Sequence, residues 1–371
     1  MTGNVIQTIF QQNFSATLKE YGFPLHMHKA AQAIMRCRTG YYGSHLEACQ
    51  QGCTTQIRNH SCHHRSCPQC NTLPRERWLE QQHARLLTCE HYHIIFTVPQ
   101  DLRRFWQFNS PLFLDDFFHA ANDALMSLCK NPLYLGGTPG VLMAFHSWSR
   151  RLDDHPHLHC LVSAEALSDS GEWVTPKRDI FLPARLLMAA FRVLLLKRMI
   201  RRARQGQWST DLGSPNDLEM LLKQQYQQRW HVQVQPRYRH GRGVVSYLAR
   251  YMRGGPCHPR QLQLVGHQVR LHPKKGDTAA AERIFSKPQF IARYLAHVPH
   301  HRQRSIRKYG LYANGHHHVQ ARNAARPAAS RIARPLKTYT PPVHSCIICG
   351  TPIARIEPII VQGQDPPRLC A

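Results

Sequence analysis

The chain has 371 residues, 42% of them hydrophobic, which suffices for a buried core and predicts two or three domains. Lys and Arg number 48 against 22 Asp and Glu, a formal charge of +26, so the expected partner is a polyanion. The sequence has neither a signal-peptide pattern nor a run of about eighteen apolar residues, which argues against secretion and a membrane span and predicts a cytoplasmic protein whose clustered cysteines bind metal.

The predicted elements fall into five segments in chain order. Residues 1–34 form a short helical lead-in, and residues 35–85 are dense in Cys and His but short of apolar runs, which is typical of a small domain that depends on a metal. Strands and helices alternate over residues 86–255. A basic extension covers residues 256–325, and a Pro/Arg-rich linker with a Cys-containing tail covers residues 326–371.

The Cys/His segment predicts a structural zinc site. Zn²⁺ takes four thiolates or imidazoles, usually as two close pairs, and we expect the ligands Cys49, Cys53, Cys67 and Cys70. A second site or ligand exchange remains open, with the candidates Cys37, His45 and Cys62. The alternative is that the surplus cysteines fill a small core. In either case the zinc-bound segment is expected to unfold without its metal.

Three histidines mark the middle segment. A strand over His93–Val98 is followed by two apolar strands, VLMAFHSWS and LHCLVSAE, joined by a short polar link that predicts an antiparallel hairpin. His157 and His159 share a face of the second of these strands, and the hairpin places His146 opposite them. Three neutral imidazoles leave open positions on a divalent ion, which is suited to phosphoryl chemistry. The alternative is that these histidines are ordinary core or surface residues.

A tyrosine pair follows downstream in VVSYLARYMRGG. Tyr247 and Tyr251 are four residues apart, so a helix places both phenols on one face, and Arg250 and Arg253 flank them. A phenol is a possible covalent nucleophile where positive charge favours its ionised form. The alternative is an amphipathic helix with two aromatic residues packed inward.

Acidic residues almost vanish between Arg237 and Lys337, where only Asp277 and Glu282 occur. This stretch predicts a basic hairpin in QLQLVGHQVRLHPK, a basic helix in FIARYLAHVPHHRQRSIRKYG and a path for nucleic acid. The expected DNA contacts include Arg304, Arg307 and Lys308, with base stacking by Tyr294, Tyr309 and Tyr312. The tail pair Cys346 and Cys349 is a weaker zinc candidate, because its partners would be His344, Cys370 or ligands of another domain. No role is assigned to His316–His318.

His157-Leu158-His159 followed by a tyrosine pair is the order of motifs in the HUH nucleases, named for His-hydrophobic-His. The chain resembles a two-tyrosine HUH transposase of the insertion sequence ninety-one family from about Cys37 to Asn314. The motifs that carry the resemblance are CRTG, NHSCHHRSCPQCN, RERWLE, YHIIFTVP, HSW before HPHLHCLV, YLARYMR and RKYGLYAN. GGPCHP after the tyrosine pair departs from the more basic continuation of the family, which bears on DNA contacts.

The resemblance implies an α+β fold: an HUH antiparallel sheet flanked by helices and preceded by the Cys/His zinc domain, with residues 86–255 as the endonuclease core. It implies nicking of single-stranded element ends through a 5′-phosphotyrosine link, a rolling-circle route and no NTP. His157 and His159 match the metal-ligand positions and Tyr247 and Tyr251 the nucleophile positions, while His146 is placed by analogy with three-histidine relaxases. The catalytic ion would be Mg²⁺ or Mn²⁺, and the enzyme would work at the bacterial nucleoid.

Three alternatives remain open from the sequence. An HUH relaxase or replication initiator performs the same nick, but the zinc module and the absence of a P-loop or helicase-like segment disfavour it. A non-catalytic zinc protein that binds nucleic acid predicts DNA binding without a covalent adduct. A degenerate copy of the element would keep the motifs without moving.

Overall fold

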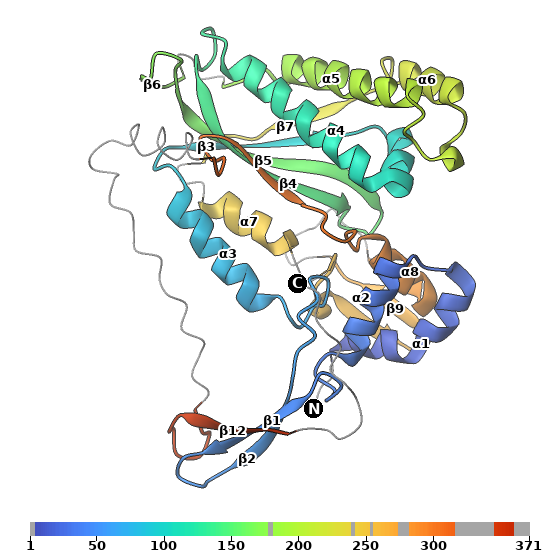
Figure 1. The fold of residues 1–371 in the computed structure, drawn as a ribbon, viewed down its shortest axis with the longest axis vertical. Helices are drawn as coiled ribbons and strands as arrows, with labels where there is room; N and C mark the ends of the chain where they lie inside the picture. Colours follow the sequence, from blue (N-terminus) through green and yellow to red (C-terminus); the bar gives the residue numbers. More distant parts are fainter. Residues whose placement is uncertain are drawn as a thin grey trace.

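A computed structural model describes residues 4–176, 181–238, 242–252, 255–273, 282–315 and 345–359. Its centre is an antiparallel sheet in the order β11 (Ile306–Gly310), β4 (Thr138–Trp148), β5 (Asp154–Leu167), β3 (His91–Thr97) and β7 (His231–Val234). The short strand β6 (Trp173–Val174) pairs with β5. The predicted α+β class and the β4–β5 hairpin are confirmed, and Figure 1 shows the sheet with helices on both faces.

The strands β4 and β5 are nearly continuous runs of buried residues because helices cover both faces of the sheet. On one face Val141, Met143 and Phe145 join the largest hydrophobic cluster, with residues of the helices above the sheet in Figure 1. These helices are α4 (Arg103–Cys129), α5 (Ala184–Arg204) and α6 (Pro215–Gln224). Two 3₁₀ turns, Gln100–Leu102 and Thr210–Leu212, flank them. Arg202 of α5 binds the fully buried Asp116 of α4 at 2.6 Å and fixes the two helices together.

The opposite face carries α3 (Thr72–Arg85) and α7 (Arg242–Met252), which lie below the sheet in Figure 1. Val244, Val245 and Leu248 of α7 pack in one cluster with Leu142 and Leu161 of the sheet. Because alternate residues of a strand share a face, this is also the face of His146 and His159.

A second group of packed elements combines helices from the N-terminal part of the chain with elements from its C-terminal half. Helices α1 (Val5–Tyr21) and α2 (Leu25–Arg36) pack with α8 (Lys287–Ala296) and a sheet of β10 (Arg283–Ser286), β9 (Gln268–Leu271) and β8 (Leu262–Val265), in a single hydrophobic cluster. A 3₁₀ turn over Pro259–Gln261 precedes β8, and the predicted β8–β9 hairpin is confirmed. Phe10 meets the buried Tyr294 ring edge-on at 5.5 Å. The lead-in and much of the basic extension therefore share one core.

A third, small sheet lies at the far end of the molecule in Figure 1. Its strands are β12 (Ile353–Ile359), β1 (Ser44–Cys49) and β2 (Thr55–Asn59), paired antiparallel in that order. A strand from near the C-terminal end of the sequence thus pairs with a hairpin near its start.

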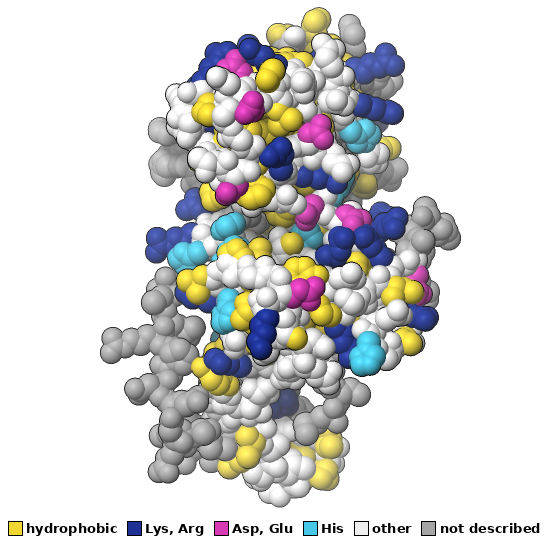
Figure 2. Space-filling view, turned by 90° about the vertical axis from the view of Figure 1, so that its right-hand side faces the viewer, with side chains coloured by type: hydrophobic (Ala, Val, Ile, Leu, Met, Phe, Trp, Pro, Cys, Tyr) yellow, Lys and Arg dark blue, Asp and Glu magenta, His cyan; other side chains and the backbone are white. Residues whose placement is uncertain are grey.

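Positive charge is spread over the surface. Figure 2 shows Lys and Arg side chains over both the upper and the lower half of one face rather than in a single patch. Across the part of the chain that the structure describes, no helix is long and apolar enough to cross a membrane.

Candidate functional site

The three predicted histidines come together at one end of the β4–β5 hairpin. The strand register pairs His146 directly with His157 and places His159 opposite Ala144, so all three side chains stand on one face. One nitrogen of each ring lies within 4.8 Å of the others. The ring centroids of His146 and His159 are 4.3 Å apart, and both side chains are buried.

Neighbouring groups fix two of these rings. Nδ1 of His159 lies 2.8 Å from Nε2 of His93 on β3, and Nδ1 of His157 lies 2.5 Å from the carbonyl oxygen of His155. An Nδ1–H that donates to such an acceptor leaves metal ligation to Nε2 of the same ring, as in many metal-binding histidines. The arrangement therefore fits an ion held by three imidazoles.

Burial also keeps these rings neutral. Desolvation lowers the pKa of His157 to about 4 and that of His159 to about 2. The same cause lowers the pKa of His93 to about 4. Neutral rings near pH 7 have the lone pairs that a divalent cation requires.

The histidines open into a cavity of about 360 Å³. Its lining includes Trp148 and Arg150 from the hairpin, His231 and Gln233 from β7, and Pro256 and Cys257 from the segment after α7.

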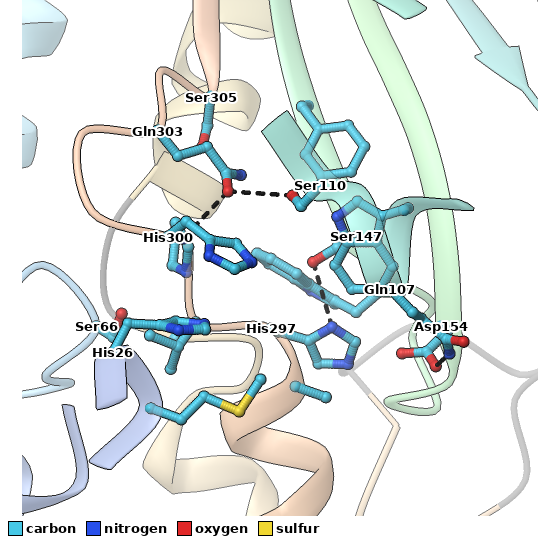
Figure 3. Close-up of a pocket in the computed structure, with 18 of the residues that line it drawn as sticks. His26, Ser66, Gln107, Ser110, Ser147, Asp154, His297, His300, Gln303 and Ser305 are labelled. Carbon is cyan, nitrogen blue, oxygen red and sulfur yellow. Dashed lines mark hydrogen bonds between the residues drawn. The ribbon is translucent and has the colours of Figure 1, made fainter. Parts of the chain in front are cut away.

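A neighbouring cavity shares Trp148 with the first and is shown in Figure 3. Apolar rings of Trp106 and Phe145 line it together with polar groups from three parts of the chain, among them His26, His300 and Gln303. Polar groups at its edge are paired: Ser147 Oγ lies 3.2 Å from His297 Nδ1, and Gln107 donates to Asp154 at 2.6 Å. The two cavities combine aromatic surface with hydrogen-bonding groups.

Helix α7 carries both predicted nucleophiles and packs on the histidine face of the sheet. The side chains of Tyr247, Tyr251 and Arg250 lie outside the described part of the structure, as does the whole of Arg253. The backbone nevertheless shows that the tyrosine pair belongs to a helix, as the sequence predicts.

Residues 255–257, shortly after α7 in the sequence, lie close to the two cavities. Gly255 has φ +82°, and a Cβ at this position would lie 1.9 Å from the hydroxyl of Tyr294. Only glycine suits this approach, and Pro256 and Cys257 follow it as cavity lining. The glycine in the unexpected GGPCHP sequence thus permits a close turn beside the site.

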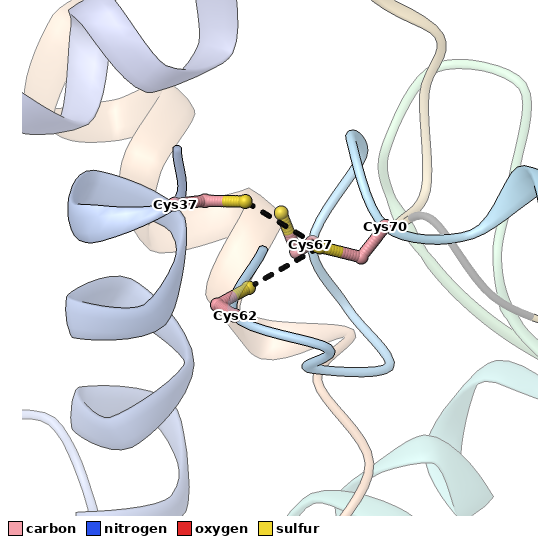
Figure 4. Close-up of side chains that lie close together, drawn as sticks. All are labelled: Cys37, Cys62, Cys67 and Cys70. Atoms are coloured by element: carbon pink, nitrogen blue, oxygen red, sulfur yellow. Dashed lines mark hydrogen bonds between the residues drawn. The ribbon is translucent and has the colours of Figure 1, made fainter. Parts of the chain in front are cut away.

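The structure corrects the predicted zinc ligands. Cys67 and Cys70 do not join Cys49 and Cys53: they meet Cys37 at the end of α2 and Cys62, as Figure 4 shows. Cys70 Sγ lies 3.4 Å from Cys37 Sγ and 3.5 Å from Cys62 Sγ. Four thiolates around Zn²⁺ at about 2.3 Å stand about 3.8 Å apart, so this cluster fits a zinc ion.

The remaining pair forms a separate cluster with the tail, Cys49 and Cys53 with Cys346 and Cys349. The prediction joined Cys49 and Cys53 with Cys67 and Cys70 because the two pairs are close in the sequence. The fold places the two pairs in different clusters. His45 belongs to neither cluster, since its ring bonds to His60 and Glu47. His344 and Cys370 lie outside the described residues, as does His316–His318.

Hydrogen bonds within the first cluster favour ionisation at Cys70. Contacts with the sulfurs of Cys37, Cys62 and Cys67 lower the pKa of Cys70, whereas contact with Cys37 raises the pKa values of Cys62 and Cys67. When a metal cation binds and displaces the thiol protons, it stabilises such a group of buried sulfurs.

Of the residues expected to contact DNA, one is exposed and another already forms an ion pair within the protein. Arg304 is exposed, whereas Arg307 binds Asp115 at 3.0 Å and lies over the ring of Phe118. Lys308 is half-buried on the edge strand β11.

The predicted base-stacking tyrosines are wrong in two cases out of three. Tyr294 is fully buried on α8 and donates to the carbonyl of Ser66 at 2.9 Å. Tyr312 is buried and accepts from the amide of Leu87. Tyr309 is half-buried. The supposed basic helix α8 is mainly a core element, because its apolar stripe packs against α1.

Comparison with known proteins agrees with this geometry. The family described as "Putative transposase" matches residues 140–320, and the transposase zinc-binding domain family matches residues 9–98. A protein of Sinorhizobium fredii described as a "Putative transposase" is 30% identical over 318 residues, 83% of this chain and 80% of that protein. The chain belongs to the insertion sequence 91 (IS91) family of transposases.

Another relative of this IS91-family transposase is the transposase of insertion sequence element IS801 from Pseudomonas savastanoi pv. phaseolicola. It is 26% identical over 350 residues, 89% of this chain and 84% of that protein. No solved structure matches the chain. The predicted family is therefore confirmed, and with it DNA as the partner of a transposase with a zinc-binding domain.

Sequence reasoning missed His93. The residue lies on the strand next to the histidine pair, and its register partner Leu161 is two residues from His159. His91 and His93 alternate in EHYHII as His157 and His159 do in PHLHC, so the same face argument could have found it.

Proposed function

We propose that this IS91-family transposase nicks and rejoins single-stranded element ends by metal-assisted tyrosine transesterification. In this proposal His146, His157 and His159 hold Mg²⁺ or Mn²⁺, and Tyr247 and Tyr251 are the nucleophiles. A divalent ion bound there would stabilise negative charge on the phosphate oxygens of the scissile bond.

The observation that carries the proposal is that the three imidazoles and α7 occupy the same face of the sheet. Pro256 and Cys257, which follow α7 by only a few residues, line the histidine cavity, so the helix bearing the tyrosines ends close in sequence to residues at the site. Family membership favours transposition over the relaxase and binding-only alternatives, because the matched relatives are named as transposases.

The reaction balances without an external energy source. The phenolic oxygen loses its proton and attacks phosphorus, a tyrosine O–P bond forms, and the bond from phosphorus to the 3′ oxygen breaks. The 3′ oxygen takes up a proton and becomes a free hydroxyl. Attack by a 3′-hydroxyl on the phosphotyrosine reverses these steps and joins strands, and a second tyrosine permits a second cut while the first remains bonded.

Single-stranded DNA fits the surroundings of the site. The two cavities that share Trp148 provide aromatic surface for an unpaired base, with Trp106 in the second, and exposed basic residues such as Arg304 neutralise phosphates. This supports a rolling-circle route, in which a displaced strand is the substrate.

The test is a covalent-adduct assay. Labelled single-stranded DNA with a candidate element end is incubated with the protein and Mg²⁺ or Mn²⁺, then separated under denaturing conditions. We expect a labelled protein band that disappears with chelator and in the Tyr247→Phe/Tyr251→Phe variant, while DNA binding remains. Tyr238→Phe, an exposed tyrosine near the start of α7, is the matched control.

Folded, zinc-loaded protein that binds the DNA but forms no adduct with any metal would contradict the proposal. An adduct that persists in the double variant would contradict the assignment of the two tyrosines.

A further inference from the structure

Among its described residues, the small sheet β12-β1-β2 has no hydrophobic core of its own. None of its described residues belongs to the three hydrophobic clusters of the protein, β2 is exposed along its length, and Ile57 is 63% exposed. Three short strands whose described residues contribute nothing to the hydrophobic clusters need another source of stability, as small domains do in general. Four cysteines lie at one end of this sheet.

These four cysteines come from opposite ends of the sequence. Cys49 ends β1 and is followed by Cys53, while Cys346 and Cys349 precede β12. All four sulfurs lie within 4.8 Å of one another, and Cys49 Sγ is 3.3 Å from Cys349 Sγ. These separations exceed the S–S bond of about 2.05 Å and bracket the 3.8 Å or so between thiolates on tetrahedral zinc.

The two cysteine pairs sit in the same kind of turn. The amide of Gln51 points to Cys49 Sγ, and that of Ile348 to Cys346 Sγ, both at 3.4 Å. In both turns the amide of the first cysteine donates to the carbonyl five residues later, at 2.9 Å for Cys49 and 2.8 Å for Cys346.

Each turn also contains a glycine with positive φ, 72° at Gly52 and 75° at Gly350. The amide of this glycine donates to the carbonyl of the first cysteine, at 2.9 Å in the first turn and 2.8 Å in the second. Amide groups directed at sulfur stabilise thiolates, so each turn is organised as half of a metal site.

We propose that Cys49, Cys53, Cys346 and Cys349 bind a second structural zinc ion, which fastens the C-terminal strand β12 to the N-terminal hairpin. The transposase zinc-binding family matches residues 9–98 only, so two of the four ligands lie far outside the matched region. The site takes a thiophilic divalent cation, and tetrahedral Zn²⁺ fits four thiolates best. Cysteines 300 residues apart in the sequence would share one ion.

The turn that carries Cys346 is held to the hairpin by its cysteines rather than by apolar packing, which favours a bound metal ion. Ile347 is 96% exposed and Ile348 is 67% exposed, so the apolar side chains of this turn contribute no buried contact. The inward Cys346 is 3% exposed. The thiols, rather than the large apolar side chains, therefore face the hairpin.

The first measurement is the zinc content of the full chain by native mass spectrometry, in a His157→Gln/His159→Gln background so that the histidine cluster contributes no zinc. We expect two ions in the parent and one in Cys346→Ser/Cys349→Ser. The matched control Ile347→Ser/Ile348→Ser changes the same turn without removing a ligand and should keep two ions. One ion in the parent, or an unchanged count in the cysteine variant, would overturn the proposal.

The second measurement maps thiol alkylation on the zinc-loaded full chain. We expect all four cysteines to be protected together, and Cys49 and Cys53 to become reactive in Cys346→Ser/Cys349→Ser while Cys62 stays protected. Protection of Cys49 and Cys53 in that variant would show that they do not depend on the tail. The readout does not involve DNA cleavage, so the proposed nuclease and this zinc site can fail separately.

Discussion

The contact between His93 and His159 gives a sharp prediction for the metal site. If Nε2 of His159 binds the ion, its Nδ1–H donates to Nε2 of His93 across the observed 2.8 Å. This bond orients the ring and increases the basicity of the ligand. His93→Leu removes the acceptor nitrogen and puts an apolar side chain in the same buried position. His159 then loses its orienting partner.

The expected loss follows from the position of His93. Residues that orient a ligand histidine typically contribute 10–100-fold to metal affinity, which corresponds to about 1.4–2.8 kcal/mol. Mn²⁺ affinity of the purified protein, measured by electron paramagnetic resonance, should fall by that factor. Nicking at saturating Mn²⁺ should recover most of its rate, because His93 does not touch the reacting atoms in this assignment.

Two further variants separate orientation from packing. His93→Gln restores an oxygen acceptor and should regain part of the affinity. His231→Gln changes a histidine of the same cavity on β7, which pairs with β3 rather than with the strand of His159, and should bind Mn²⁺ as the parent does. Equal Mn²⁺ affinity in His93→Leu and the parent, with both folded, would refute the assignment of His93 as a positioning residue.

Three other outcomes are expected. Arg304→Gln should lower the slope of log Kd against log salt for single-stranded DNA by about 0.7, the value for one phosphate contact. Arg307→Gln should change this slope less, because Asp115 already pairs with that charge. Equal changes of slope in the two variants, measured by salt titration, would contradict this prediction. Tyr312→Phe leaves the buried His91 without its hydroxyl partner and should lower the free energy of unfolding by about 1–3 kcal/mol in urea titrations. Chelation of zinc should lower the thermal midpoint, since an ion at 100 times its Kd stabilises the fold by about 2.7 kcal/mol, and added Zn²⁺ should restore it.

Local patterns predicted much of the fold. The alternating His157-Leu158-His159, the apolar strand before it and the short polar link defined the antiparallel hairpin and its histidine face, because strand periodicity and hairpin geometry are local properties. The tyrosine helix and the β8–β9 hairpin followed from the same kind of reasoning. His93 needed one further step, the neighbour of β5 in the sheet, which a single sequence does not specify.

The errors come from interactions between distant segments. The ligands of the zinc clusters were grouped by sequence distance, but Cys37 reaches its cluster through the end of α2, and Cys49 meets a cysteine pair from the tail. Tyr294 was taken for a base-stacking residue because its neighbours are basic. Its burial depends on α1, whose Phe10 lies 284 residues earlier in the sequence and packs against its ring.

The two faces of the central sheet explain how one fold supports both a stable core and a reactive site. Phe145 and Leu158 alternate with His146 and His157, so each step along these strands turns from the main hydrophobic cluster to the histidine face. A one-residue shift of the hairpin register would exchange these two sets and bury the imidazoles under α4 and α5. The extensive apolar packing on one face therefore fixes the register that assembles the histidines on the other, and the position of the proposed metal site follows from the core that lies behind it.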